Sequence, residues 1–274
     1  MKGLSHETQL ELEYRLGSNE GMINILVPED AIAERKAWSY GALAGSYFGR
    51  GVLLQLLGQN AKAEEAFSQV IANSKNSVGA NLFEQDHSHQ YALFIFALLV
   101  GDYEQANESA YVISKLGVTS SRLQAPSEVY VAFVELWLKN ADSVKALIPS
   151  LEKIENKKNE KYIKSGFVNA LKGVLDGNLS LVVDGIQNML AAHKHEAKYL
   201  KEALDHNHFI CIPALLLSIV AIRYGMDIKK AVEGSEVVLK TKMESPLDRP
   251  EIPEKTKFEV PVDLIPDYII EKWY

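Results

Sequence analysis

The stretch LLQLLGQNAKAEEAF, residues 53–67, places one glycine between an apolar run and an alanine-rich amphipathic run. Apolar residues on both sides of Gly58 recur at three- and four-residue spacing, which is the period of an α-helix. Glycine tolerates the left-handed conformation that ends a helix, so Gly58 predicts a tight turn between two helices. The small residues Ala63 and Ala66 would then let the second helix approach the first closely. The stretch therefore predicts a helical hairpin.

The same arrangement recurs along the chain. It is found in IFALLVGDYEQANESA (95–110), AFVELWLKNADSVKALI (132–148), ALKGVLDGNLSLVVDGI (170–186) and LLSIVAIRYGMDIKKAV (216–232). The junctions in these stretches are Gly101, Lys139 with Asn140, Gly177 and Gly225. Asp102 follows the first of these junctions and is expected to cap the helix after it.

Five helical hairpins in series predict an all-α protein that buries a continuous core between neighbouring hairpins. The junctions are unevenly spaced and lie further apart than the tetratricopeptide period of about 34 residues. We therefore expect an irregular tetratricopeptide-like stack. A compact helical domain built from the same hairpins fits the spacing equally well, and the sequence does not separate the two.

The last part of the chain has a different composition. From about Glu244 it carries five of the nine prolines, at positions 246, 250, 253, 261 and 266. Prolines this dense prevent a continuous helix, so residues 244–274 are predicted to be an extended tail. Its end, FEVPVDLIPDYIIEKWY, is apolar enough to dock on the helical domain that we expect over residues 1–243.

Charge and hydropathy narrow the class of protein. The chain has 29 basic and 36 acidic residues, a net charge of −7, which favours a basic partner over nucleic acid. The N-terminus lacks the pattern of a secretory signal. The longest apolar stretch, residues 209–222, is interrupted by Pro213 and is shorter than the roughly 20 residues that span a bilayer. These features predict a cytoplasmic protein without membrane contact, with Cys211 buried.

Six of the seven histidines form His-x-His pairs. The pairs are His87 with His89, His193 with His195, and His206 with His208. Residues two apart on a helix point about 200° apart, whereas helical zinc sites use positions i and i+4. We therefore favour surface or capping histidines over a metal site, and no metal or cofactor is expected. A metal-dependent helical enzyme that uses these pairs remains the least favoured hypothesis.

Other chemistry-bearing patterns are weak. The sequence has no nucleophile elbow, phosphate-binding loop or His-Glu-x-x-His motif, so a non-enzymatic protein is predicted. Two groups of aromatic residues are expected to pack in the helical core. They are Trp38, Tyr40, Tyr47 and Phe48 on one helix, and Tyr91, Phe94 and Phe96 on another.

Several stretches together resemble the immunity protein 49 family of bacterial polymorphic-toxin systems. They are residues 36–58, 91–110, 177–200 and 210–228, followed by the proline-bearing ending VPVDLIPDYII at 260–270. The resemblance extends from about Ala37 to the C-terminus. It implies an all-α antidote that binds a toxin encoded beside it, usually a nuclease, and it transfers no catalytic residue.

An inhibitor of a nuclease can imitate phosphate charge with carboxylates, so acidic clusters are the candidates for toxin contact. These candidates are Glu64, Glu65, Asp102, Glu104, Glu108, Glu202 and Asp205. For any one of them, a solvated helix face or a cap is the favoured interpretation. The main rival hypothesis is a tetratricopeptide-like adaptor that grips a peptide or protein along a concave face.

Overall fold

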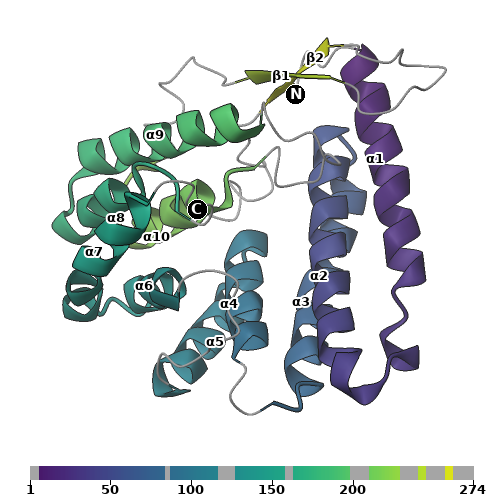
Figure 1. Cartoon of the computed structure of the whole chain (residues 1–274), viewed down its shortest axis with the longest axis horizontal. Helices are drawn as coiled ribbons and strands as arrows, with labels where there is room; N and C mark the ends of the chain where they lie inside the picture. Colours follow the sequence, from purple (N-terminus) through teal and green to yellow (C-terminus); the bar gives the residue numbers. More distant parts are fainter. Residues whose placement is uncertain are drawn as a thin grey trace. The chain divides into compact units, whose positions relative to one another are not determined.

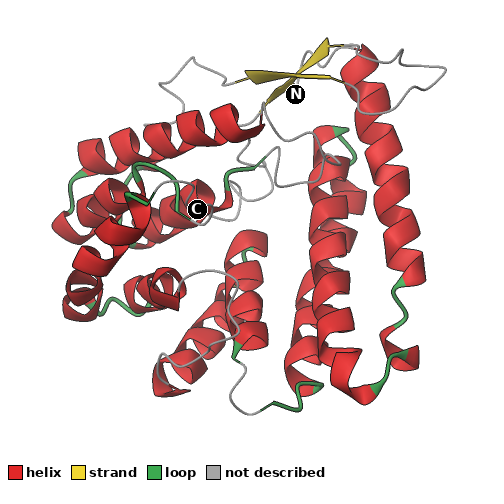
Figure 2. Ribbon diagram, viewed as in Figure 1, coloured by secondary structure: helices red, strands yellow, loops and turns green. Residues whose placement is uncertain are grey.

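The computed structural model describes residues 6–83, 87–116, 127–157, 163–197, 210–228, 240–244 and 257–261. Helices dominate these residues, and one antiparallel strand pair accompanies them (Figure 2). The all-α prediction is confirmed. Contacts divide the described elements into two compact units.

The first unit contains three long helices that lie side by side (Figure 1). They are α1 (His6–Ile25), α2 (Ala33–Leu56) and α3 (Asn60–Gly79), with the short 3-10 helix η1 (Pro28–Asp30) between the first two. The strands β1 (Lys240–Glu244) and β2 (Lys257–Pro261) pair in the same unit, and β2 contacts α1.

The second unit contains the remaining described helices. They are α4 (Ser88–Val100), α5 (Tyr103–Leu116), α6 (Ser127–Trp137), α7 (Ala141–Glu155), α8 (Phe167–Asp176), α9 (Leu179–Ala197) through residue 192, and α10 (Ile212–Arg223). The buried helix α10 contacts α4, α6 and α8. It carries most of the long apolar stretch that the sequence predicts to be buried, and Cys211 beside it is buried as expected.

All five predicted junctions adopt the left-handed conformation. Gly58, Gly101, Gly177 and Gly225 have φ between 66° and 82°, and Lys139 has φ 62°. Each turn closes with two backbone hydrogen bonds of the Schellman type. At the first, the Gln59 amide donates to the Leu54 carbonyl at 2.8 Å and the Gly58 amide donates to the Gln55 carbonyl at 2.9 Å. The sequence therefore located the four glycine turns to the residue and the fifth to the pair Lys139 and Asn140, of which Lys139 is the left-handed residue.

Four of the turns join helix pairs that the structure describes: α2 with α3, α4 with α5, α6 with α7, and α8 with α9. In the first pair, Ala63 and Ala66 are buried as predicted, and Phe48 lies 5.9 Å from Phe67 between ring centroids. A Cβ atom at Gly51 would sit 2.5 Å from the Phe67 ring. This glycine leaves room for the aromatic ring that fills the hairpin.

In the α8–α9 hairpin, glycines lie directly against backbone atoms of the partner helix. A Cβ atom at Gly185 of α9 would lie 2.6 Å from the Gly166 carbonyl oxygen and 2.6 Å from the Ala170 amide nitrogen. Gly173 of α8 similarly faces the Val182 backbone nitrogen at 2.7 Å from an added Cβ. The two helix backbones therefore touch through glycine at both points.

The C-terminal prediction is only partly within the described residues. Residues 257–261 are extended, and β1 begins at Lys240, slightly before the predicted change at Glu244. The docking of the tail, the boundary between residues 1–243 and 244–274, and tetratricopeptide-like stacking all stay predictions. Within the described part of the chain, no helix combines the length and apolar character that crossing a bilayer requires.

Candidate protein-binding surfaces

The histidine pairs do not form a shared site in the described residues. Both His193 and His195 lie on α9 and point to different sides, as expected for positions about 200° apart. His195 is exposed as predicted, but His193 is buried, so the prediction of a surface or capping histidine is wrong at that position. His87 precedes the first residue of α4, and His89 lies in its first turn. The described residues contain no group of three or more side chains placed to hold a metal ion. His206 and His208 lie outside the described residues.

The acidic candidates separate into two kinds. Asp102 caps α5, because its Oδ1 accepts a hydrogen bond from the Gln105 amide at 3.1 Å. Glu64 and Glu65 are exposed on the first turns of α3. Glu202 and Asp205 lie outside the described residues. Asp102 is thus accounted for by the helix it starts, whereas the glutamates of α3 remain available to solvent.

Glu104 and Glu108 belong to an exposed stripe on α5. Together with Tyr111 and Lys115 they occupy positions i, i+4, i+7 and i+11, so all four share one helix face. The Lys115 ammonium lies 4.0 Å from the centroid of the Tyr111 ring, which is 58% exposed. We call these four residues the α5 face. It presents one aromatic ring whose surface is already covered by a cation.

A polar and aromatic cluster holds α5 in place. Asn107 Oδ1 accepts hydrogen bonds from Trp137 Nε1 at 2.9 Å and from Arg223 Nη2 at 3.2 Å. Tyr103 packs against the Trp137 ring with 5.6 Å between centroids, and burial raises the pKa of Tyr103 to about 12. The cluster joins α5, α6 and α10, so it fixes the orientation of the α5 face.

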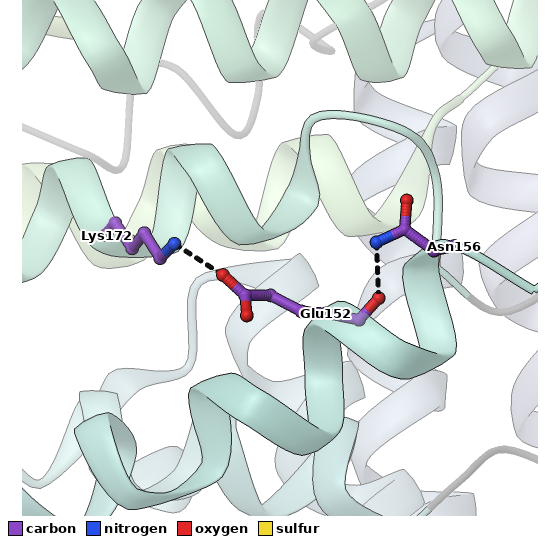
Figure 3. A network of polar contacts seen from close by, with 3 residues as sticks. All are labelled: Glu152, Asn156 and Lys172. Atoms are coloured by element: carbon purple, nitrogen blue, oxygen red, sulfur yellow. Dashed lines mark hydrogen bonds and ion pairs between the residues drawn. The ribbon is translucent and has the colours of Figure 1, made fainter.

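The α7–α8 connection carries a second polar network (Figure 3). Lys172 Nζ donates to Glu152 Oε1 at 2.6 Å, and Asn156 Nδ2 donates to the Glu152 carbonyl at 2.8 Å. Glu155 Oε1 accepts from the Gly166 amide at 2.7 Å, where α8 begins. The Glu152 and Lys172 side chains are both exposed by more than a third, so this pair adds little stability.

The predicted aromatic core is only partly confirmed. Phe48, Tyr91 and Phe94 are buried as expected, whereas Trp38 is 64% exposed. The other three predicted core aromatics are half-buried: Tyr40, Tyr47 and Phe96. The residue before Trp38 on α2, Ala37, is buried, and its carbonyl accepts a hydrogen bond from Ser77 Oγ on α3 at 2.7 Å. Residues one apart on a helix point about 100° apart, so packing of α3 on Ala37 leaves Trp38 at the side. The prediction that Trp38 is core is wrong.

Helix α1 has an unusual distribution of polarity. It buries Thr8, Glu11 and Arg15, and Glu11 Oε1 accepts a hydrogen bond from Arg15 Nε at 2.8 Å. At the same time it exposes Met22 by 51% and Ile25 by 75%. This arrangement cannot be predicted from the sequence, because apolar and polar residues are not separated onto opposite sides of α1.

The turn after α1 continues the exposed apolar surface. Val27 and Ile32 are 47% and 62% exposed, and they flank the acidic residues of η1. Glu29 Oε1 accepts a hydrogen bond from the Tyr40 hydroxyl at 2.9 Å. Its own backbone amide, and then Tyr40, lower the pKa of Glu29, so it is ionised at neutral pH.

Comparison with known proteins adds no relative. No family model matches the chain, and neither the curated proteins nor the solved structures contain a significant match.

Proposed function

We propose that this protein is an immunity protein that binds a bacterial toxin domain. It catalyses no reaction and neutralises the toxin by stoichiometric occlusion. The proposal joins the sequence resemblance to one structural observation. Large apolar side chains stay exposed over the stretch from Tyr14 to Trp38, where a globular protein would gain by burying them. Such a surface suits a macromolecular partner.

The mechanism would be exclusion of the toxin's own substrate. An apolar centre that is desolvated on binding supplies most of the affinity, and carboxylates around it raise the association rate with a basic partner. A nuclease needs a basic surface to engage nucleic acid, so an acidic inhibitor is electrostatically suited to cover that surface. The net charge of −7 supports this choice of partner.

The direct test is co-expression in a bacterial host. The product of each neighbouring reading frame is induced alone and then together with this protein, and colony survival is counted. We expect one neighbour to be toxic and survival to be restored by this protein. Unchanged killing, or the absence of any toxic neighbour, would overturn the proposal.

The adaptor hypothesis makes a different prediction. It is also compatible with the described helical hairpins, which are the building units of tetratricopeptide-like adaptors. A tetratricopeptide-like adaptor binds short linear peptides, whereas an antidote binds a folded domain. Size-exclusion chromatography of this protein with the intact toxin domain and with overlapping peptides from the toxin separates the two. Binding to a peptide as tight as binding to the domain would favour the adaptor.

A further inference from the structure

We propose that the outward side of α1 and the turn that follows it form the surface on which a basic toxin domain docks. We call this surface the α1 face, and it consists of Tyr14, Met22, Ile25, Val27 and Ile32, with the carboxylates of Asp30 and Glu34 beside them. This assignment rests on the proposed function, and it names the contact surface and the chemistry of the partner.

The apolar residues of the α1 face that belong to the helix share one side of it. Tyr14, Met22 and Ile25 occupy positions i, i+8 and i+11, so they lie within about 80° of one another around the axis. Val27 and Ile32 extend the surface into the turn before α2. The most exposed of these side chains is Ile25, at 75%.

The inward side of α1 packs polar groups beside a single leucine and leaves the most exposed apolar residues outside. That side buries Leu12 and Thr8 together with the Glu11–Arg15 ion pair, and a buried ion pair is weak evidence for stability because desolvation offsets its attraction. The helix therefore buries charge against its own protein while it leaves hydrocarbon in water. A partner that covers these apolar side chains would remove the cost of their exposure to water.

The charge around the α1 face selects the partner. Between His6 and Glu34 the only basic residue is Arg15, which is buried and paired with Glu11. The exposed charges in this stretch are the carboxylates of Glu13, Glu29, Asp30 and Glu34, while Glu20 pairs with Arg50 at 3.1 Å. Arg35, which is exposed, and Lys36, which interacts with Glu29, follow at the start of α2, so the carboxylates of the stretch still outnumber the cations beside it. Asp30 and Glu34 are the exposed carboxylates next to Val27 and Ile32.

A negative rim disfavours three other occupants. It repels the phosphates of nucleic acid and the head groups of an anionic membrane. A second copy docked through a two-fold axis would place the same carboxylates close to each other, because the two partners of such an interface present the same patch. A protein with a basic surface and an apolar patch is the complementary partner.

The α5 face is the alternative surface, and it is less suited to this role. There Lys115 covers the Tyr111 ring at 4.0 Å, so the surface already contains the cation that a basic partner would supply. The α5 face therefore provides a matched control. It offers the exposed Tyr111, with the exposed Val112 next to it on the helix, and two exposed glutamates for equivalent substitutions.

The experiment uses the full chain and the toxin domain encoded beside it, with affinity measured by calorimetry and association rate measured at low and high salt. We expect Met22→Asn with Ile25→Asn to weaken binding at least about 30-fold, as for buried interface anchors. The change Asp30→Lys with Glu34→Lys should slow association roughly 10-fold at low salt and reduce its salt dependence. Both variants change exposed side chains, and equal unfolding midpoints would confirm that they fold.

The matched controls are Tyr111→Asn with Val112→Asn, and Glu104→Lys with Glu108→Lys. Wild-type affinity in the α1-face variants together with weakened binding in these controls would overturn the assignment and leave the proposed function intact. The assignment also fails if light scattering shows that Met22→Asn with Ile25→Asn separates a dimer without changing toxin affinity. If the wild-type chain neither binds nor protects against the toxin, the proposed function itself fails, and this assignment fails with it.

Discussion

The guanidinium of Arg223 lies over the indole ring of Trp137, with Cζ 3.9 Å from the ring centroid. Arg223 Nε also donates a hydrogen bond to the Trp137 carbonyl at 3.1 Å. The two residues are far apart in sequence, and the hydrogen bonds that both make to Asn107 bring α5 into the same contact. This one arginine therefore joins the ends of α6 and α10 to the middle of α5.

Replacing Arg223 by alanine should destabilise the second unit. The variant loses a cation–π contact and two hydrogen bonds, and we expect the free energy of unfolding to fall by about 1–2 kcal/mol. Arg223→Lys should recover only part of this loss, because an ammonium lacks the planar arrangement of donors. Urea denaturation measures both variants, and Arg35→Ala, at an exposed position, should stay within about 0.5 kcal/mol of wild type.

A methyl group at Gly185 should be poorly tolerated. It would collide with the Gly166 carbonyl and the Ala170 amide, both at 2.6 Å, and backbone atoms cannot move aside as a flexible side chain can. We expect Gly185→Ala to lower the free energy of unfolding by about 1–3 kcal/mol, as overpacking does elsewhere.

The control for this change is Gly45→Ala on α2, where an added Cβ meets nothing within 4 Å. Alanine has the higher helix propensity, so this variant should be neutral or more stable by up to about 1 kcal/mol. A shared loss of stability in the two variants would show that the close approach of α8 and α9 is not the cause.

Replacing Lys139, which has a left-handed backbone conformation, by glycine should stabilise the protein. A non-glycine residue in this conformation is disfavoured by roughly 1–2 kcal/mol, which glycine avoids. Lys139→Gly should therefore raise the free energy of unfolding, although the distant contact of Lys139 with the Tyr224 ring at 5.7 Å is lost. The reverse change, Gly177→Ala at φ 66°, should lower it by about 1 kcal/mol. Opposite signs in thermal unfolding confirm the prediction, and equal signs contradict it.

Stability should fall in strongly alkaline solution. Burial raises the pKa of both Tyr91 and Tyr103 from 10 to about 12 in the folded protein. Between these two values the unfolded chain loses the phenolic protons first, so the unfolded state binds fewer protons and the free energy of unfolding decreases as pH rises. This contribution is fully present below pH 10 and is lost as pH approaches about 12.

The measurement is urea denaturation at several values of pH in this window. Tyr91→Phe keeps the ring against Tyr130, at 5.5 Å between centroids, but removes the titrating hydroxyl. The slope of stability against pH should be shallower in this variant than in wild type. An unchanged slope would show that the Tyr91 hydroxyl ionises equally in both states.

The helical turns could be predicted because their cause is local. A glycine that accepts a positive φ between two apolar runs is visible in the sequence. At the turn without glycine, the asparagine marked the junction, but the positive φ falls on Lys139, one residue before it. Asp102 was recognised as a cap for the same reason, since its hydrogen bond reaches only three residues along the chain. The opposite placement of His193 and His195 follows from helix geometry alone.

The candidate surfaces could not be predicted, because exposure depends on neighbours distant in sequence. The sequence shows Trp38 on an amphipathic helix but does not show on which side α3 will pack. In the same way, nothing local indicates that α1 buries the Glu11–Arg15 pair and turns Ile25 outward. The acidic candidates were chosen by charge alone, so the sequence missed the apolar residues that distinguish the α1 face.

The short connections between paired helices also bear on how the chain acquires its structure. Only two residues separate Val100 from Tyr103, and the same is true of Asp176 and Leu179. Closing so short a loop costs little entropy, and contacts between segments close in sequence form rapidly. Each hairpin is thus expected to assemble early, as its second helix leaves the ribosome, whereas the joining of Arg223 to Trp137 has to wait for nearly the whole second unit to be synthesised.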